Sequence, residues 1–568
     1  MNNRKKIIAI ITTAIIVAIC VTSSGYNLQC FFAEMFFGGE NSIDSDIIFS
    51  KKSGFYENEF HLKIYAPSKE IYYTLDGSEP TKASDKYEAP ILIRDATQNQ
   101  NVYSSRTDVC GSFLMEESMY KVPDYLVDKC TIIKVAYYDK NGERSNIENR
   151  TYFVGVNEKE GYDDINIISV TTDPANLFSD EKGIYVLGDT FKEYCETNDL
   201  SKRNFYRWGA NFLNRGKEWE REANIQVFNT DKELVFSQNV GIRIQGGVCR
   251  GLLPKSLNFY ARDEYGDSRM RYDFWGTGYY PQRMTLSGGG NDYYGKILDR
   301  LGADLTRNLE FCKMNFEPYA LFLNGEYWGF YYLTEKYDEH YIEHYYDVDS
   351  DNVVIIKNGK LEVGTEGDHD DYEHMISFLE NVDMTDDSNY QMACAMLDMQ
   401  SFIDYFAAEV YMARRVDWPS SNYALWRSRE TSEKAYEDGK WRWMLFDVNT
   451  SAFIDDIVDH NTLDYVLEES AMFANLYRNE EFKELFSKRI LKMADTIFEP
   501  SLVEQKVTEY EELMSEPMGK NHQRFFSLDN AAFHSRAAMV KEFAKNRKKY
   551  IEAIIEEDAA ILETMWSN

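Results

Sequence analysis

Two aspartates and an asparagine in the C-terminal half are residue types that can support transfer of a phosphoryl group. Asp417 and Asn422 stand five residues apart, and Asp447 follows after two strand-like stretches. Transfer with Mg²⁺ needs one carboxylate to orient the acceptor hydroxyl and take its proton. An amide oxygen and a second carboxylate must hold the metal against the phosphates. The same spacing also fits an Asx turn after a helix, so the surrounding elements decide between the two.

The elements predicted around these residues would bring them together. Apolar residues at helical spacing predict a long helix over residues 390–414, and residues 422–426 and 441–446 read as two strands of a hairpin. Because a hairpin returns the chain on itself, it would carry Asp447 back to the loop of Asp417. This order of elements resembles the catalytic loop and the metal-binding aspartate of protein kinases.

A glycine-rich segment with fixed positive charge lies upstream of this loop. A predicted strand carries Arg243 and runs into Gly246 and Gly247, which are followed by Arg250 and Lys255. Glycine lets backbone N–H groups approach phosphate closely, and an acidic protein must concentrate positive charge somewhere to hold ATP. A tight β-hairpin with solvated basic residues would have the same pattern.

Four ordered segments resemble the CotH (spore-coat protein H) family of atypical kinases. They are GIRIQGGVCRGLLPKSLNFYARDEYG (241–266), LNGEYWGFYYLTEKYD (323–338), DWPSSNYALWR (417–427) and WRWMLFDVN (441–449). The resemblance spans about residues 165–548. It implies an atypical kinase fold that uses ATP and Mg²⁺ or Mn²⁺ to phosphorylate Ser/Thr hydroxyls of surface or spore-coat proteins, and its own hydroxyls.

Matched position by position, the resemblance assigns a role to each candidate residue. Asp417 is the catalytic aspartate, and Asn422 and Asp447 are the metal ligands. Lys255 pairs with the ATP phosphates. The nucleotide-binding residues that the resemblance implies are Arg243, Gly246, Gly247, Lys255 and Glu335.

The chain departs from the family pattern at several of these positions. Asn449 replaces the second aspartate of the family's D-x-D motif, Gln245 replaces an arginine, and Val248-Cys249 lack the usual serine. Asparagine can coordinate a hard cation through its carbonyl oxygen but brings no charge. A catalytically inactive member, acting as a surface or coat-assembly scaffold, is therefore the alternative to an active kinase.

Residues 45–155 have the pattern of an all-β domain. Short alternating stretches are separated by turn sequences such as Asp76-Gly77, which predicts a small immunoglobulin-like β-sandwich. The string IYYTLDGSEPT (71–81) resembles the module at the C-terminus of chitobiase and β-hexosaminidase. The resemblance implies a spacer or accessory domain, and a glycan-associated surface protein is a further alternative.

From residue 165 the pattern mixes strands and helices, and after residue 463 it is almost wholly helical. The predicted fold is therefore multidomain, an all-β domain at 45–155 followed by an α+β kinase-like domain at 165–568 with a helical C-terminal part. Residue pairs such as Asn324-Gly325 predict tight hairpins within it.

The N-terminus predicts export from the cytoplasm. A basic cap precedes an uncharged apolar run, so residues 1–22 are predicted to be a signal-anchor or a signal peptide, and residues 23–44 a linker. We therefore expect a protein at the cell surface, held by one N-terminal membrane segment or secreted after cleavage. In such a compartment Cys110 and Cys130 could form a disulfide.

The composition excludes some functions. With 95 acidic against 62 basic residues the net charge is −33, which disfavours nucleic-acid binding. The surplus suits solvation or the attraction of divalent cations. The 8 histidines are dispersed, so a histidine-based metal centre is not expected.

Overall fold

The computed structural model describes residues 46–156 and 159–566 of the chain. The predicted signal segment at 1–22 and linker at 23–44 lie outside these residues. The chain divides into two compact units. The first is formed by Met1–Arg243 with Ala320–Gly329, and the second by Ile244–Tyr319 with Phe330–Asn568.

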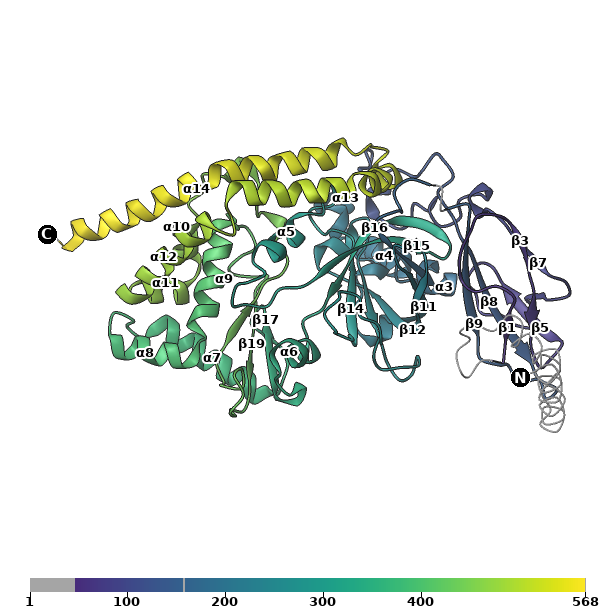
Figure 1. Cartoon of the computed structure of the whole chain (residues 1–568), viewed down its shortest axis with the longest axis horizontal. Coiled ribbons are helices and arrows are strands. Elements are labelled where there is room, and N and C mark those ends of the chain that lie inside the picture. The colour runs from purple at the N-terminus through teal and green to yellow at the C-terminus, as the bar shows by residue number, and fades with distance from the viewer. Residues whose placement is uncertain (1–45, 157–158, 567–568) are drawn as a thin grey trace, which may run out of the picture. The chain divides into compact units, whose positions relative to one another are not determined.

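The N-terminal region of the first unit is rich in β-structure (Figure 1). One sheet has the strand order β2-β9-β8-β5-β6, and two smaller sheets pair β3 with β7 and β1 with β4. The inward side chains form a core that includes Leu62, Ile71, Val135 and Tyr152. The strands are β1 Ile48–Phe49, β2 Gly54–Tyr56, β3 Phe60–Leu62, β4 Ile64–Tyr65, β5 Glu70–Thr74, β6 Asp85–Lys86, β7 Ile91–Ile93, β8 Thr131–Tyr138 and β9 Glu148–Val154.

Two details of this region differ from the sequence predictions. One of the alternating stretches, at 60–65, is divided at Lys63, and β3 and β4 join different sheets. Cys110 and Cys130 are both buried, and no disulfide joins them in the structure. The Cys130 N–H donates instead to Gly325 O at 2.9 Å, which holds this end of β8.

The remaining elements of the first unit are three long strands and several short helices. β10 and β11 are antiparallel, with Val170 opposite Ile225. The elements are β10 Asn166–Thr171, β11 Arg221–Phe228, β12 Leu234–Ile244, α3 Pro174–Phe178, α4 Gly188–Thr197, η1 Ala96–Gln98, η2 Gly111–Leu114, η3 Leu200–Lys202, η4 Phe205–Arg207, η5 Asn211–Leu213 and η6 Lys217–Trp219.

Seven strands close into a barrel in the order β10-β11-β12-β13-β14-β16-β15. Within it, Leu257 of β13 is opposite Leu286 of β14, and Met284 of β14 is opposite Glu335 of β16. The last four strands are β13 Leu257–Tyr260, β14 Arg283–Ser287, β15 Phe316–Leu323 and β16 Glu326–Glu335. The predicted turn between β15 and β16 is confirmed: Asn324 (φ 45°) and Gly325 (φ 87°) both take the left-handed conformation that such turns require.

A second sheet in the second unit has the order β18-β17-β19-β20. β19 and β20 form the predicted antiparallel hairpin, with Leu425 opposite Trp443. The strands are β17 Val353–Lys357, β18 Lys360–Val363, β19 Ala424–Ser428 and β20 Arg442–Met444. This sheet matters most for function because the segments that carry Asp417, Asn422 and Asp447 adjoin it.

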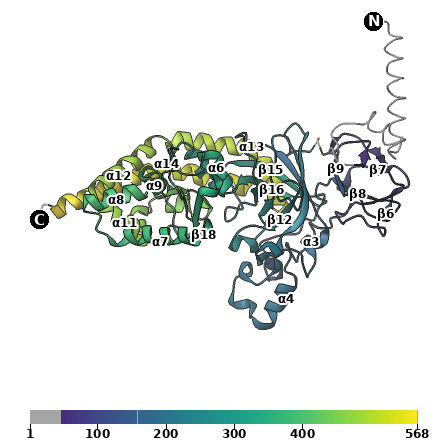
Figure 2. The same cartoon turned by 90° about the horizontal axis from the view of Figure 1, so that it is seen from below.

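Helices make up most of the C-terminal part. α13 and α14 lie side by side (Figure 1), and α12 lies against α9 (Figure 2). The helices are α5 Leu298–Leu305, α6 Glu339–Tyr346, α7 Glu366–Asn381, α8 Asp387–Met396, α9 Met399–Tyr411, α10 Thr462–Glu469, α11 Ala471–Tyr477, α12 Glu480–Asp495, α13 Pro500–Phe526, α14 Ala531–Trp566, η7 Val248–Gly251, η8 Ser350–Asn352, η9 Val448–Thr450 and η10 Asp455–Ile457. The chain is thus multidomain, with a β-rich N-terminal region and a helical C-terminal part, as predicted.

The predicted single helix over 390–414 is wrong, because it is two helices that break at Leu397-Asp398. The Asp398 side chain caps α9 by accepting the Ser401 N–H, and the Asp398 N–H donates to Trp441 O at 3.0 Å. α9 is buried from Ser401 to Tyr411. None of the helices within the described residues is both long and apolar enough to cross a membrane.

Candidate functional site

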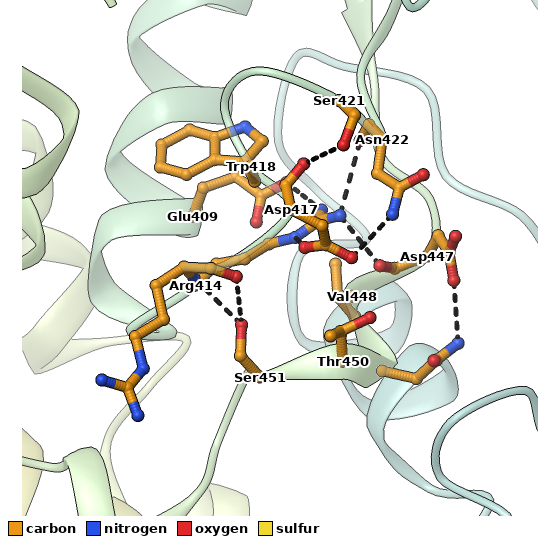
Figure 3. A network of polar contacts seen from close by, with 12 residues as sticks. Glu409, Arg414, Asp417, Trp418, Ser421, Asn422, Asp447, Val448, Thr450 and Ser451 are labelled. Atoms are coloured by element: carbon orange, nitrogen blue, oxygen red, sulfur yellow. Dashed lines mark hydrogen bonds and ion pairs between the residues drawn. The ribbon is translucent and has the colours of Figure 1, made fainter. Parts of the chain in front are cut away.

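The loop after α9 holds Asp417 and Asn422 in direct contact (Figure 3). The Asn422 Nδ2 donates to Asp417 Oδ2 at 2.7 Å, and both the N–H and the hydroxyl of Ser421 donate to Asp417 O. Asn422 has φ 54°, a left-handed conformation that asparagine tolerates better than most residues. The loop therefore fixes the orientation of the Asp417 carboxylate before any ligand binds.

Arg414 connects this loop to the segment of Asp447. Its guanidinium is fully buried and forms an ion pair with the equally buried Glu409, at 2.8 Å. It also donates to Asp447 O at 2.8 Å and to Phe446 O at 3.2 Å, and its Nε lies 3.8 Å from Asp417 Oδ1. Only arginine offers this many donors in one plane. Arg414, which sequence reasoning did not single out, therefore organises the site.

At Glu409, the effect of burial on the pKa outweighs the opposing effect of the charge of its partner Arg414. Burial raises the pKa of Glu409 to about 6, although the adjacent guanidinium lowers it. The same balance holds at Asp447, where burial raises the pKa and Arg414 opposes the shift. The site around Arg414 thus holds more buried negative charge, on Glu409 and Asp447, than Arg414 neutralises.

Asp447 follows β20 in a left-handed conformation (φ 57°) and is linked to two residues beyond the predicted set. The Asn449 Nδ2 donates to Asp447 Oδ1 at 3.1 Å and to Asp299 Oδ2 at 2.5 Å. Asp299 Oδ1 accepts the Val448 N–H at 2.8 Å. Burial, and then the charge of Asp447, raises the pKa of Asp299 to about 7.

Sequence reasoning missed Asp299. Its one sequence signal is its place in the first turn of α5, shortly after three consecutive glycines. Acidic residues are common in first helical turns because they offset the exposed N–H groups there. The position by itself therefore could not show that Asp299 contacts a segment about 150 residues away.

The triglycine loop, residues 287–292, joins the segment of Lys255 to that of Asn449. The Gly288 N–H donates to Ser256 Oγ at 2.9 Å, and the Asn291 N–H donates to Asn449 Oδ1 at 3.1 Å. A Cβ at Gly288 would lie 2.4 Å from Pro254 O. The loop therefore needs glycine to pass this close, and it was not among the predicted site elements.

Lys255 is wholly buried at the end of the glycine-rich segment. Its Nζ donates to Arg250 O at 2.5 Å and to Leu252 O at 3.3 Å. Gly246 has φ 113°, and a Cβ there would lie 2.2 Å from Cys249 Sγ, whereas Gly247 has open space beside it. Burial and then the charge of Asp447 raise the pKa of Cys249, so this loop lies within electrostatic reach of Asp447.

The two other predicted residues are engaged by nearby protein groups. Arg243, in the first unit, pairs with the buried Glu220 at 3.2 Å. Glu335 is buried and accepts hydrogen bonds from the backbone N–H and side-chain amide of Asn315 and from the Tyr345 hydroxyl. Burial raises the pKa of Glu335. Its carboxylate thus fastens β16 to the start of β15 and to α6.

Comparison with models of protein families identifies the family of this chain. Residues 242–551, more than half of the chain, match the family described as CotH kinase protein. The chain belongs to the CotH kinase family. Residues 60–152 match the family described as Fn3 associated. No curated protein matches the chain.

Within the CotH domain, the side chains around Asp417 fit a hard divalent cation. Among the described residues, no three His, Cys, Asp or Glu side chains form a metal-binding group. The centre instead combines the Asp417 and Asp447 carboxylates with the Asn422 amide, and such oxygen donors suit Mg²⁺ or Mn²⁺. Asp417 Oδ1 is buried, accepts no hydrogen bond and lies 3.8 Å from Arg414 Nε.

Proposed function

We propose that this member of the CotH kinase family transfers the γ-phosphate of ATP to Ser/Thr hydroxyls of proteins, with Mg²⁺ or Mn²⁺. The observation that carries the proposal is the joint fixing of Asp417, Asn422 and Asp447 by Arg414 and by the hydrogen bond between Asn422 and Asp417. A buried arginine that connects three segments is a costly arrangement, and it suits a site that must be preorganised.

In this proposal Asp417 is the general base. As the hydroxyl oxygen of the acceptor attacks the γ-phosphorus, its proton passes to Asp417, and the bond to the bridging oxygen breaks to release ADP. Arg414 lies beside the buried Oδ1 of Asp417 and Asn422 Nδ2 donates to Oδ2, so the carboxylate is held in place with Oδ2 on the side that the acceptor would reach. Asn422 and Asp447 would hold the metal, which neutralises charge on the phosphate oxygens when bound.

The nucleotide would lie along the glycine-rich segment. Lys255, Gly246 and Gly247 are the residues of that segment that we propose for the phosphates, while Arg243 and Glu335 support it through Glu220 and Asn315. On this account Lys255 would have to exchange a backbone carbonyl partner for phosphate.

The finer architecture and the location belong to the same proposal. We infer that the CotH domain has an atypical kinase fold, and that the module at 45–155 is an immunoglobulin-like β-sandwich acting as a spacer. We further propose that the protein works outside the cytoplasm, attached to or released from the membrane by residues 1–22, on surface or coat proteins.

A non-catalytic scaffold is the second candidate, and the observation that favours it is Asn449. Its amide nitrogen donates to Asp447 and Asp299, and its oxygen accepts the Asn291 N–H. The hydrogen bonds of Asn449 thus connect Asp447, Asp299 and Asn291. Because asparagine replaces an aspartate here, the site would hold its metal with one carboxylate fewer than the family pattern provides.

Labelling of the full-length chain tests the proposal. The chain is incubated with γ-³²P-ATP and either Mg²⁺ or Mn²⁺, with and without an acceptor protein. We expect label in wild type and almost none in Asp417→Asn or Asp447→Asn, while Asp370→Asn, an exposed acid on α7, labels normally. Thermal stabilisation by ATP and metal without label under any condition would instead identify a scaffold.

A further inference from the structure

Lys357, the last residue of β17, is held firmly beside the loop of Asn422. It lies opposite Ala424 of β19. The turn that follows is anchored by two hydrogen bonds, from the Asn358 N–H to Tyr423 O at 3.0 Å and from the Tyr423 N–H to Asn358 Oδ1 at 3.2 Å. The backbone that carries Lys357 is therefore fixed to the residue that follows Asn422.

The ammonium group of Lys357 lacks a polar partner. It lies 4.1 Å from the ring centroid of Phe446, the residue before Asp447. No hydrogen bond or ion pair joins it to any residue within 46–156 and 159–566. Burial, followed by the charge of Lys336, lowers its pKa. The side chain is part-buried, so its three donors are only partly hydrated.

The contact with Phe446 does not account for this position. A cation over an aromatic ring gains about 0.5–2 kcal/mol, and it leaves the N–H donors directed away from the ring free for another acceptor. A surface lysine would normally extend its ammonium into water. The described part of the chain provides no hydrogen bond or ion pair for this ammonium group, so the group is available to an anion from outside.

The charges around Lys357 suit an anion that also contacts a metal. Lys336, directly after β16, repels Lys357, while Glu362 of β18 and then Asp447 attract it. Lys357 thus brings positive charge to the side of Asp447, where the proposed metal would sit. A phosphate chain bound to that metal carries surplus negative charge that such a lysine can neutralise.

We propose that Lys357 binds the phosphate chain of the nucleotide, donating to an oxygen of the phosphate that lies against Asp447. This inference rests on the proposed function, because it places the phosphates at the same centre. Lys357 would contact the substrate directly and strengthen its hold as charge develops on the transferred group.

The test compares Lys357→Met with Lys360→Met in the full-length chain. Lys360 lies opposite Lys357 in the β17–β18 pairing and is exposed, so its loss removes the same charge from the same hairpin. Methionine preserves the packing on Phe446. We expect Lys357→Met to weaken binding of ATP with Mn²⁺ about 10- to 100-fold, as for the loss of one charge-assisted hydrogen bond. Lys360→Met should bind as wild type does, and Lys357→Arg should keep part of the affinity.

Two further measurements separate this inference from the kinase proposal. Without nucleotide, Lys357→Met should melt no lower than wild type, because the part-buried ammonium has no hydrogen bond or ion pair among the described residues to lose. Calorimetry with inorganic tripolyphosphate and Mn²⁺ measures phosphate binding without any transfer. If wild type binds tripolyphosphate through Lys357 but labels no protein, the kinase proposal fails and the assignment of Lys357 stands.

The opposite outcomes overturn the assignment of Lys357. If Lys357→Met binds ATP and tripolyphosphate as tightly as wild type, while wild type labels protein, the kinase proposal stands and Lys357 does not touch phosphate. If wild type binds neither ATP nor tripolyphosphate, Lys357 has no phosphate ligand and the assignment is wrong.

Discussion

Buried carboxylates have opposite hydrogen-bonding environments in two regions of this molecule. In the first unit, Glu326 at the tip of the β15–β16 hairpin accepts the backbone N–H groups of Val102, Tyr103 and Ser104, at 2.6, 3.2 and 2.7 Å. In the second unit, Asp417 keeps one buried oxygen without a hydrogen bond, and burial raises the pKa of Asp447. A satisfied acid fastens the fold, whereas an unsatisfied acid cluster is suited to binding a cation.

The largest effect should come from removing the charge of Asp417. Asp417→Asn keeps an oxygen that can accept the Asn422 Nδ2, so the loop should persist while the general base is lost. We expect labelling to fall about 1000-fold, within the range for loss of a general base. The melting temperature should stay level or rise. A large fall in stability would show that Asp417 is structural, like Glu326.

The next largest effect should appear at Glu326, as a loss of stability. Glu326→Ala leaves three N–H groups without their charged acceptor and should lower the free energy of unfolding by about 3 kcal/mol. Denaturant unfolding of the full-length chain, with exposed Glu88→Ala as the control, measures it. An unchanged midpoint would remove the contrast between the two regions.

Asn449→Asp would sharpen the comparison by adding a carboxylate to the cluster. In EDTA we expect a lower melting temperature, because Asp299 and Asp447 lose an N–H donor and gain a like charge. Mg²⁺ should then raise the melting temperature further than it does in wild type. A variant that responds to Mg²⁺ no more than wild type would argue against a metal beside Asp447.

The smallest expected effect is on the pH dependence of the free energy of unfolding. The folded-state pKa of Glu409, about 6, is above its usual value of 4.5, so the folded state binds this proton more tightly than the unfolded state does. The contribution to the free energy of unfolding is therefore present at low pH. It decreases by about 2 kcal/mol as the pH rises through 4.5 to 6. Glu409→Gln should flatten that part of the pH–stability curve, and an unchanged slope would contradict the shift.

Local pattern was enough to predict the hairpins and the family. The Asn324-Gly325 turn and the β19–β20 pair follow from turn residues and alternation, and the four CotH-like segments were readable in order. The break between α8 and α9 was missed because apolar spacing continues across Asp398, although that residue is a good helix cap.

The contacts that complete the site could not be read from the sequence. Asp299, Arg414 and Lys357 are ordinary charged residues in their own segments. Their importance comes from tertiary contacts with Asn449, Asp447 and Phe446. Such long-range pairs leave no periodic signal, so only the folded structure reveals them.

The most direct test is the position of the metal itself. Crystals of the full-length chain grown with Mn²⁺ and a non-hydrolysable ATP analogue would locate the ion by its anomalous scattering. We predict one Mn²⁺ bound by Asn422 Oδ1 and the Asp447 carboxylate, in contact with the phosphates. Nucleotide bound elsewhere, or Mn²⁺ absent from these two side chains, would contradict the account.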